Sequence, residues 1–224
     1  IDFVVHAIAF SDKDELTGRY VDTTADNFTK SLFISCYSFT AVAQRAEKLM
    51  ATIDAALDAA GLPLSAVGRI AVTVGPGSFT GIRVGVAAAR GLALSLGVDS
   101  VGISTLETLA NMADETTGPV LAAMNAKRDE VYLQRFSAKR VPEGEPEMAS
   151  LDRFREIAAS GEWQIVGSAG TLLADPGAET EKDRFSISVV ARLGADAKAA
   201  GKPKPLYLRG PDAKPQTGFA VSRA

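Results

Sequence analysis

The strongest chemical signal in the chain is the segment 75–81, which reads GPGSFTG. It lies between a short apolar run and a longer Ala/Leu-rich run, a pattern that predicts a loop leading from a strand into a helix. Backbone amides at such a helix start can hold an anion. The candidates for an anion-binding loop are Gly75, Gly77, Ser78, Thr80 and Gly81.

Neither common nucleotide fingerprint fits this loop. A Walker loop continues from its last glycine into Lys and Ser/Thr, whereas Ile82 and Arg83 follow Gly81. The dinucleotide spacing requires a third glycine where Thr80 stands. Two interpretations therefore remain open: glycines that permit a tight turn and close helix packing, and a weak site for a nucleotide phosphate.

Nucleophilic and metal chemistry have few candidate residues. Ser78 would need a base to act as a peptidase nucleophile, and His6 is the only imidazole in the chain. Cys36 is the only cysteine, which excludes an intramolecular disulfide and a Cys-rich zinc site. We therefore expect no catalytic residue and no metal site.

Composition and charge narrow the class of protein. With 224 residues, 46% apolar and 23% charged, the chain is long and apolar enough for an ordinary folded core. The net charge of −3 provides no general attraction for nucleic acid, although Lys202, Lys204, Arg209 and Lys214 cluster near the end. No run of about 18 apolar residues is evident, so we expect no membrane segment and a cytoplasmic protein.

The periodicity along the chain predicts an α/β fold. Strands are expected at residues 3–10, 19–23, 32–37, 69–74, 100–103, 119–124, 130–136 and 163–166, and helices at 42–61, 82–96, 151–160 and 186–200. Residues 104–107, STLE, form a capping box that starts a further helix, and a Pro/Glu loop is expected at 141–147. The capping box also marks the boundary between two predicted lobes, residues 1–105 and 106–224.

Two predicted helices have apolar residues that could pack either in the protein's own core or against a partner. Helix 42–61 presents Leu49, Met50, Ile53 and Leu57 at steps of three and four residues. Helix 82–96 is apolar or small nearly all round, except where Arg83 and Arg90 interrupt it. Burial inside the protein's own core and pairing with a partner helix are both consistent with these patterns.

Residues 72–83, VTVGPGSFTGIR, followed by Gly85, closely resemble the hallmark of the TsaB (YeaZ) family. Residues 46–49 (AEKL), 104–107 (STLE) and 206–209 (LYLR) resemble further family segments, so the similarity extends over about residues 45–216. The first 44 residues do not follow the family pattern. Arg45 stands where the family often has His, and Asn125 stands where it usually has Asp.

The resemblance implies a two-lobed actin-like, ribonuclease-H-like ATPase (ASKHA) fold, with the last segment returning to the N-terminal lobe. It implies a non-catalytic subunit of the machinery that makes threonylcarbamoyladenosine (t6A) at position 37 of tRNA. The implied partners are TsaD, then TsaE as third subunit, a second copy when the chain is alone, and tRNA through the complex. ATP with Mg²⁺ is expected in the assembled complex, without a cofactor on this chain itself. The implied interface residues are Leu49, Met50, Ile53, Leu57, Arg83, Val86 and Arg90. An ATPase or peptidase-like enzyme of the same fold remains the alternative.

Overall fold

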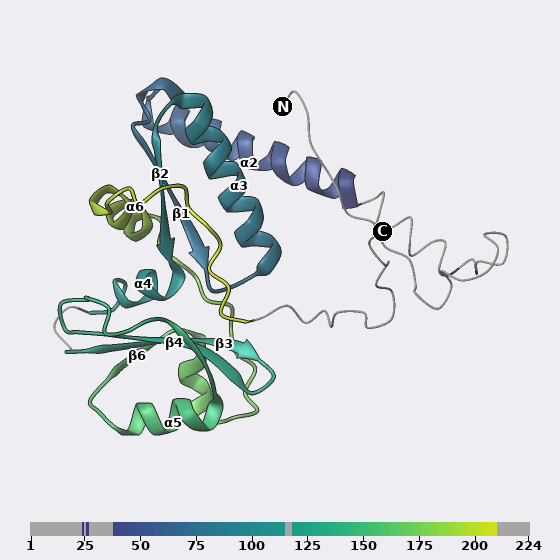
Figure 1. Cartoon of the computed structure of the whole chain (residues 1–224). Helices are drawn as coiled ribbons and strands as arrows, with labels where there is room; N and C mark the ends of the chain where they lie inside the picture. Colours follow the sequence, from purple (N-terminus) through teal and green to yellow (C-terminus); the bar gives the residue numbers. More distant parts are fainter. Residues whose placement is uncertain (1–23, 25, 27–37, 115–117, 210–224) are drawn as a thin grey trace, which may run out of the picture. The chain divides into compact units, whose positions relative to one another are not determined.

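A computed structural model describes residues 24, 26, 38–114 and 118–209 (Figure 1). The strands predicted at 3–10, 19–23 and 32–37 lie outside these residues. The chain divides into two compact units, Ile1–Ala66 and Val67–Ala224. Each unit is described by itself.

The first unit contains the long helix α2, Ser38–Ala60, followed by the short 3-10 helix η4, Leu64–Ala66. The helix predicted at 42–61 is confirmed and begins four residues earlier. It ends at Gly61, which has a left-handed φ of 64°. The amide of Leu62 then donates to the carbonyl of Leu57 at 3.0 Å, which closes the helix end.

In the second unit, the parallel strands β1 (Arg69–Gly75) and β2 (Asp99–Ser104) form Sheet A. Helix α3, Phe79–Leu96, connects them and packs on β1. Helix α6, Ile187–Asp196, also packs on both strands. The valine side chain of Val72 faces Gly85 of α3, whereas Ala71 faces Gly194 of α6, so the two helices cover opposite faces of the sheet.

Sheet B has four strands in the order β5-β4-β3-β6. These strands are β3 (Val120–Lys127), β4 (Glu130–Phe136), β5 (Glu147–Ser150) and β6 (Gln164–Val166). β3 pairs antiparallel with β4 and parallel with β6. The sheet was expected from its apolar runs, except for β5, which begins at the end of the predicted Pro/Glu loop.

Sheet B is buried on both faces. One core contains Leu121, Val131 and Leu133 of the sheet with Phe154 of α5, Leu151–Ala159. The other contains Val120 and Phe136 with Leu106 of α4, Thr105–Ala110. The 3-10 helix η5, Ser168–Leu173, adds Ala169 and Leu172 to the first core. The predicted mixed α/β class is confirmed.

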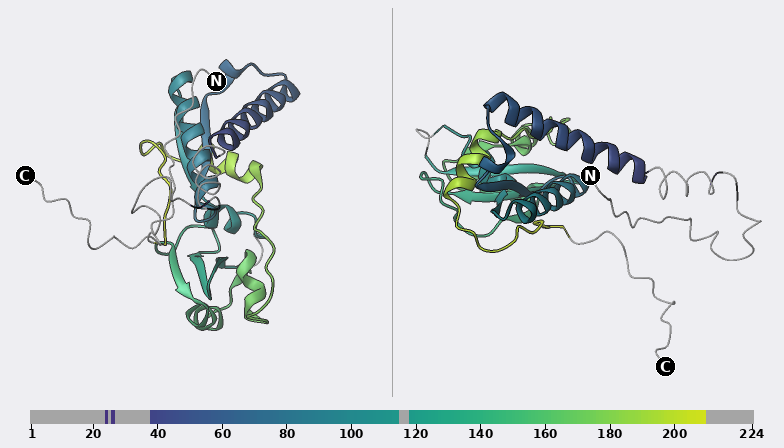
Figure 2. Two further views of the ribbon diagram at one scale, coloured as in Figure 1. Left: turned by 90° about the vertical axis from the view of Figure 1, so that its right-hand side faces the viewer. Right: turned by 90° about the horizontal axis from the view of Figure 1, so that it is seen from above.

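The segment after α6 runs back along Sheet A as an extended strap, residues 201–209 (Figure 2). The amide of Leu206 donates to the carbonyl of Val74 at 2.8 Å. Pro203 lies against Gly102 of β2, where a Cβ would be 3.3 Å from the proline ring. Pro203 and Pro205, the prolines of the strap, agree with this extended path.

Helix α3 is, within the described residues, the one helix long and apolar enough to cross a membrane by length and composition alone. The helix is not an unbroken apolar run, and it passes the test on its mean hydropathy with two arginines included. The signal is weak, because core helices of other proteins pass the same test and α3 carries Arg83 and Arg90. Its more informative property is that only 22% of this apolar helix is buried inside the structure.

Candidate functional site

The loop at residues 75–81 is held by contacts within the unit. The Thr105 hydroxyl donates to the carbonyl of Pro76 at 2.5 Å, and Ser78 is the N-cap of α3, its hydroxyl accepting from the amide of Gly81 at 3.3 Å. A Cβ at Gly75 would lie 2.8 Å from the Ile82 side chain. These contacts account for the glycine and serine in structural terms, and the Ser78 cap uses one of the amides that an anion would need.

An aromatic–arginine cluster formed by Phe79, Arg83 and Tyr207 lies at the start of α3. The Arg83 guanidinium stacks 3.8 Å from the centre of the Phe79 ring and 5.5 Å from that of Tyr207. Its Nε donates to the Tyr207 hydroxyl at 2.6 Å. The two rings remain 55% and 45% exposed, so this ordered cluster is open to solvent. Arginine and tyrosine are the residue types that most often dominate binding at protein interfaces.

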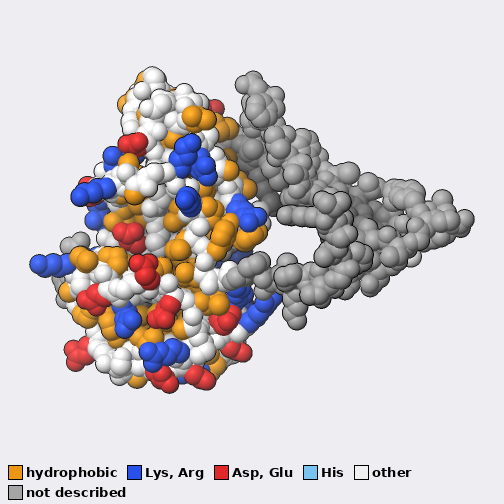
Figure 3. Space-filling model, in the orientation of Figure 1, with side chains coloured by type: hydrophobic (Ala, Val, Ile, Leu, Met, Phe, Trp, Pro, Cys, Tyr) orange, Lys and Arg blue, Asp and Glu red, His pale blue; other side chains and the backbone are white. Residues whose placement is uncertain are grey.

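The cluster continues along α3 as an exposed stripe, the α3 stripe, made of Phe79, Arg83, Arg90 and Leu94. These residues recur at steps of four and seven and so lie on one side of the helix. Leu94 is 78% exposed, although it is a large apolar residue. In the space-filling view, basic and hydrophobic side chains lie next to one another over the region of α3 (Figure 3). The stripe is apolar and basic, because α3 contains no acidic residue.

The other side of α3 faces the core of the unit. Ile82, Val86, Ala89 and Ala93 are its buried residues, and Val86 is 3% exposed. Val86 was grouped with the interface candidates from the sequence, but it packs within the protein's own core and is not part of the exposed stripe. Arg83 and Arg90, in contrast, are both exposed.

The other interface candidates lie on α2. Leu49, Met50, Ile53 and Leu57 are each half-buried, whereas most described side chains around them on this helix are exposed. The four residues thus mark the apolar side of α2 that the sequence period predicts.

The capping box expected at residues 104–107 starts α4. The Ser104 hydroxyl accepts from the amide of Leu106 at 3.2 Å, and Glu107 is bonded to the backbone of Ser104. Burial raises the pKa of the Glu107 carboxyl, and the hydrogen bond to Ser104 opposes part of that effect. The same Ser104 ends β2, so this motif links Sheet A to α4.

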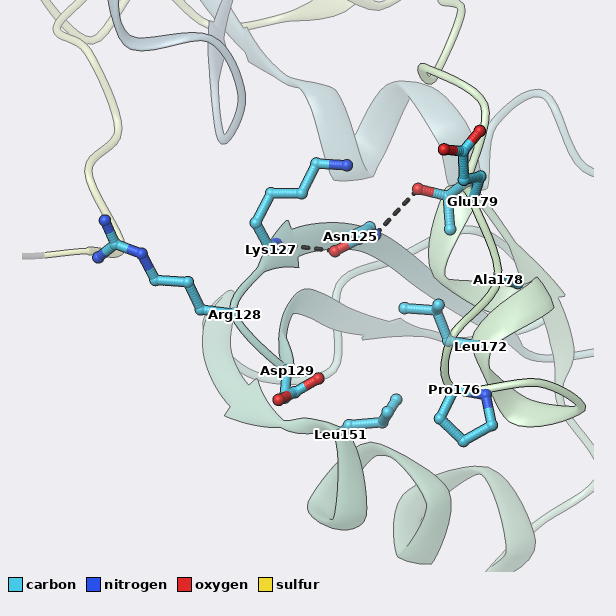
Figure 4. Close-up of a pocket in the computed structure, with 10 residues that line it drawn as sticks. Asn125, Lys127, Arg128, Asp129, Leu151, Leu172, Pro176, Ala178 and Glu179 are labelled. Atoms are coloured by element: carbon cyan, nitrogen blue, oxygen red, sulfur yellow. Dashed lines mark hydrogen bonds between the residues drawn. The ribbon is translucent and has the colours of Figure 1, made fainter.

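Sequence reasoning missed a cavity beside the turn between β3 and β4, where it predicted only a polar connection. Lys127, Arg128 and Asp129 all have left-handed backbones, with φ of 65°, 57° and 58°. Each non-glycine residue in this region costs about 1 kcal/mol. The turn borders a cavity of about 340 Å³ whose walls also include Leu151 and Leu172 (Figure 4).

Arg209, one of the basic residues in the predicted basic cluster, binds the β3–β4 turn. Its guanidinium donates to the carbonyl of Ala126 at 3.0 Å and forms an ion pair with Glu130. A role of Arg209 in binding nucleic acid would require breaking these contacts. Within the part of the chain that the structure describes, no group of three or more His, Cys, Asp or Glu residues is placed to hold a metal ion.

Comparison with protein families gives a match to the model described as "TsaD: tRNA N6-adenosine threonylcarbamoyltransferase" over residues 40–165, more than half of the chain. The tRNA threonylcarbamoyladenosine biosynthesis protein TsaB of Escherichia coli is 33% identical over 189 residues, covering 74% of this chain and 81% of the relative. The chain belongs to the TsaB family. Membership confirms the family resemblance that residues 72–83 carry.

Solved structures agree with the TsaB assignment. The YeaZ protein of Pseudomonas aeruginosa superposes with a TM-score of 0.58 at 26% identity, covering 73% of this chain and 84% of that one. A second structure, of an uncharacterized protein with similarity to peptidase YeaZ from P. aeruginosa, gives a TM-score of 0.60 at 27% identity.

A second similarity involves a different protein class. An enoyl-[acyl-carrier-protein] reductase [NADH] of Rhizobium meliloti is 74% identical over 50 residues, which is 22% of this chain and 18% of the reductase. The chain thus spans about a fifth of the length of the reductases it matches. The TsaB match covers 74% of the chain and is therefore much the longer of the two similarities.

Proposed function

We propose that this TsaB-family chain is a non-catalytic scaffold that binds TsaD through α2 and α3 in the complex making t6A on tRNA. The proposal includes the two-lobed ASKHA fold of the family, with its lobes at residues 1–105 and 106–224. It also includes TsaE as third subunit, pairing with a second copy when TsaD is absent, and action in the cytoplasm. tRNA and ATP with Mg²⁺ would then be bound by the assembled complex.

The observation that carries the proposal is the low burial of α3. Only 22% of the 18 residues of this apolar helix are fully buried, and its large apolar side chains Phe79 and Leu94 are 55% and 78% exposed. The α3 stripe adds to this surface an arginine already ordered by Phe79 and Tyr207, which lowers the entropy lost on binding. A partner with an apolar and acidic helix face would cover both features.

The test is light scattering on a gel-filtration column with the chain alone and mixed with TsaD from the same organism. The wild-type mixture should give a new peak at the mass of the mixed complex. Leu94→Glu should remove that peak, because it places a charge on the most exposed apolar residue of the α3 stripe. The matched control is Val141→Glu. Val141 is also an exposed apolar residue, at 58%, but it lies in the loop after β4 and not on α3.

Circular dichroism of both variants separates lost pairing from lost folding. Leu94 is exposed, so Leu94→Glu should keep the wild-type spectrum and melting temperature. If Leu94→Glu pairs with TsaD as well as the wild type does, α3 is not the interface and the proposal is wrong in that respect.

The enzyme alternative is tested by ligand-dependent melting of the isolated chain. A bound nucleotide would raise the melting temperature by an amount that grows with RT ln(1 + [L]/Kd). We expect no shift with ATP and Mg²⁺, because the Ser78 hydroxyl already occupies the amide of Gly81 in the loop that resembles a phosphate site. A clear rise that Ser78→Ala alters would favour nucleotide binding instead.

A further inference from the structure

We propose that Arg209 is a positioning residue for the α3 stripe and acts through the strap. Its ion pair with Glu130 of Sheet B fixes the end of the strap, and the strap in turn keeps Tyr207 on Arg83. All of these residues belong to the second unit. The inference goes beyond the pairing proposed above, and the part of it that concerns affinity for TsaD rests on that pairing.

The strap is attached to Sheet A before it reaches Tyr207. Pro203 is buried, and the amide of Leu206 donates to the carbonyl of Val74 at 2.8 Å. The Leu206 carbonyl also lies close to Gly75, where a Cβ would be 3.1 Å from that oxygen. These contacts fix the path of the strap past the end of β1, but they do not involve the Tyr207 side chain.

Tyr207 itself has little support from the rest of the fold. Its side chain is 45% exposed. Among the described residues, its hydroxyl bonds only to the Nε of Arg83, at 2.6 Å, and its ring centre lies 5.4 Å from that of Phe79. Both of these partners are exposed side chains on the same helix, so they hold Tyr207 only weakly.

Arg209 supplies a stronger anchor two residues later. Its side chain is 23% exposed and that of Glu130 is 35% exposed, so this ion pair is partly shielded from water. The same guanidinium nitrogen donates to the carbonyl of Ala126 at 3.0 Å. Two extended residues span only about 7 Å, so fixing Arg209 limits how far Tyr207 can move from Arg83.

The strap therefore connects a surface on α3 to a turn of Sheet B. In Figure 1 it is the yellow trace that passes the end of β1 on its way from α6 to the turn between β3 and β4. An arginine that is already ordered loses less entropy on binding than a free one. Loss of the ion pair at Glu130 should thus release Arg83, although Glu130 lies on β4 and not on α3.

The first readout is the Nε–H signal of Arg83 in the full chain labelled with ¹⁵N, which requires no partner. In the wild type, the hydrogen bond to Tyr207 should slow the exchange of this proton with water. Glu130→Gln removes the charge but keeps the shape, and it should speed this exchange about 5-fold. Glu147→Gln, at an exposed carboxylate on β5 of the same sheet, is the matched control and should leave the exchange unchanged. Equal exchange in Glu130→Gln and the wild type would overturn the proposal.

The second readout is the affinity for TsaD, measured by titration calorimetry. Glu130→Gln should weaken binding about 5-fold, and Tyr207→Phe should weaken it to a similar extent because the hydrogen bond to Arg83 is lost. The double variant should bind like either single variant, since both changes release the same arginine. If the two losses add instead, Glu130 acts by another route and the positioning role is wrong.

Failure of the positioning role can be told apart from failure of the proposed pairing. If the wild-type chain does not bind TsaD, the pairing is wrong, and the proton exchange of Arg83 still decides whether Arg209 positions it. If Leu94→Glu abolishes binding while Glu130→Gln changes neither exchange nor affinity, only the positioning role is wrong. Glu130→Gln should keep the wild-type circular dichroism spectrum, so that a lower affinity does not reflect lost folding.

Discussion

Sheet A and Sheet B are built from similar apolar strands but are buried to different degrees. In Sheet B, β3 is buried at Val120, Leu121, Ala122, Ala123 and Met124 in succession. In Sheet A, β1 has an equally continuous apolar run, yet it is buried only at Gly75 and half-buried over residues 70–74. Both strands have helices on both faces, so the helices do not explain the difference.

The number of strands in each sheet explains this difference in burial better. β3 is flanked by β4 and β6, whereas the described part of Sheet A consists of β1 and β2 alone. Parallel strands with continuous apolar runs are normally buried inside larger sheets. Sheet B therefore forms a core by itself, and Sheet A with α3 retains surface that other groups, from this chain or a partner, can cover.

The two sheets should differ most in the stability that is lost when one apolar side chain in each is truncated to alanine. Phe154→Ala should lower the free energy of unfolding by about 3–5 kcal/mol, because Phe154 is fully buried against Sheet B. Ile70→Ala in β1 should cost less than half as much, since Ile70 is only half-buried. Urea denaturation followed by circular dichroism measures both. Equal losses would show that Sheet A is as well covered as Sheet B.

A smaller effect should come from the contact that fixes α6 to Sheet A. The Arg69 guanidinium donates to the carbonyls of Gly194, Ala195 and Ala197 at 3.2, 2.8 and 3.0 Å, so it caps the end of α6. Arg69→Met should destabilise the protein by about 1–2 kcal/mol. The matched control Arg192→Met removes an exposed arginine from the same helix and should be nearly neutral. A loss no larger than the control's would mean that α6 is held by packing alone.

The smallest effect is expected at Glu107, where Sheet A joins α4. Its raised pKa means that the folded protein holds the proton more tightly than the unfolded chain. Stability should therefore be fullest below the ordinary carboxyl pKa and decrease as pH rises through the raised value. Glu107→Gln should be slightly more stable than the wild type above that window and equal to it below.

Thermal unfolding at several pH values measures this difference, with the exposed Glu145→Gln as control. If Glu107→Gln is the less stable protein at neutral pH, the hydrogen bond to Ser104 outweighs the cost of burial. The link between Sheet A and α4 would then depend on an ionised Glu107.

The sequence predicted those elements whose own residues determine them. The period of α2, the apolar runs of β1, β3 and β4, and the capping box of α4 all appear where expected. Helix α3 begins earlier than predicted because the Ser78 hydroxyl caps it, which brings Phe79 and Thr80 into the helix. The short strand β5 was missed because only its pairing with β4 makes it a strand.

The candidate sites depended more on tertiary contacts. The family resemblance grouped Val86 with Arg83 and Arg90 as interface residues, but in the folded protein Val86 is 3% exposed and faces inward. The stacking of Arg83 on Phe79 and Tyr207, and the clamp of Arg209 on the β3–β4 turn, join residues far apart in the chain. The turn itself gave one usable signal, since Asn125 two residues before Lys127 is typical of a side chain that stabilises its own turn.

The strap has a consequence for how the protein is made. Its Tyr207 meets Arg83 across 124 residues of sequence, and its Arg209 meets Ala126 across 83. Contacts of such separation form slowly, because a long loop must close before they contribute. A nascent chain can therefore complete Sheet B before the strap is synthesised, but the aromatic–arginine cluster is assembled only after Tyr207 has emerged. A nascent chain without the strap would lack an ordered Arg83, and partner recognition would be delayed until the strap has folded onto α3.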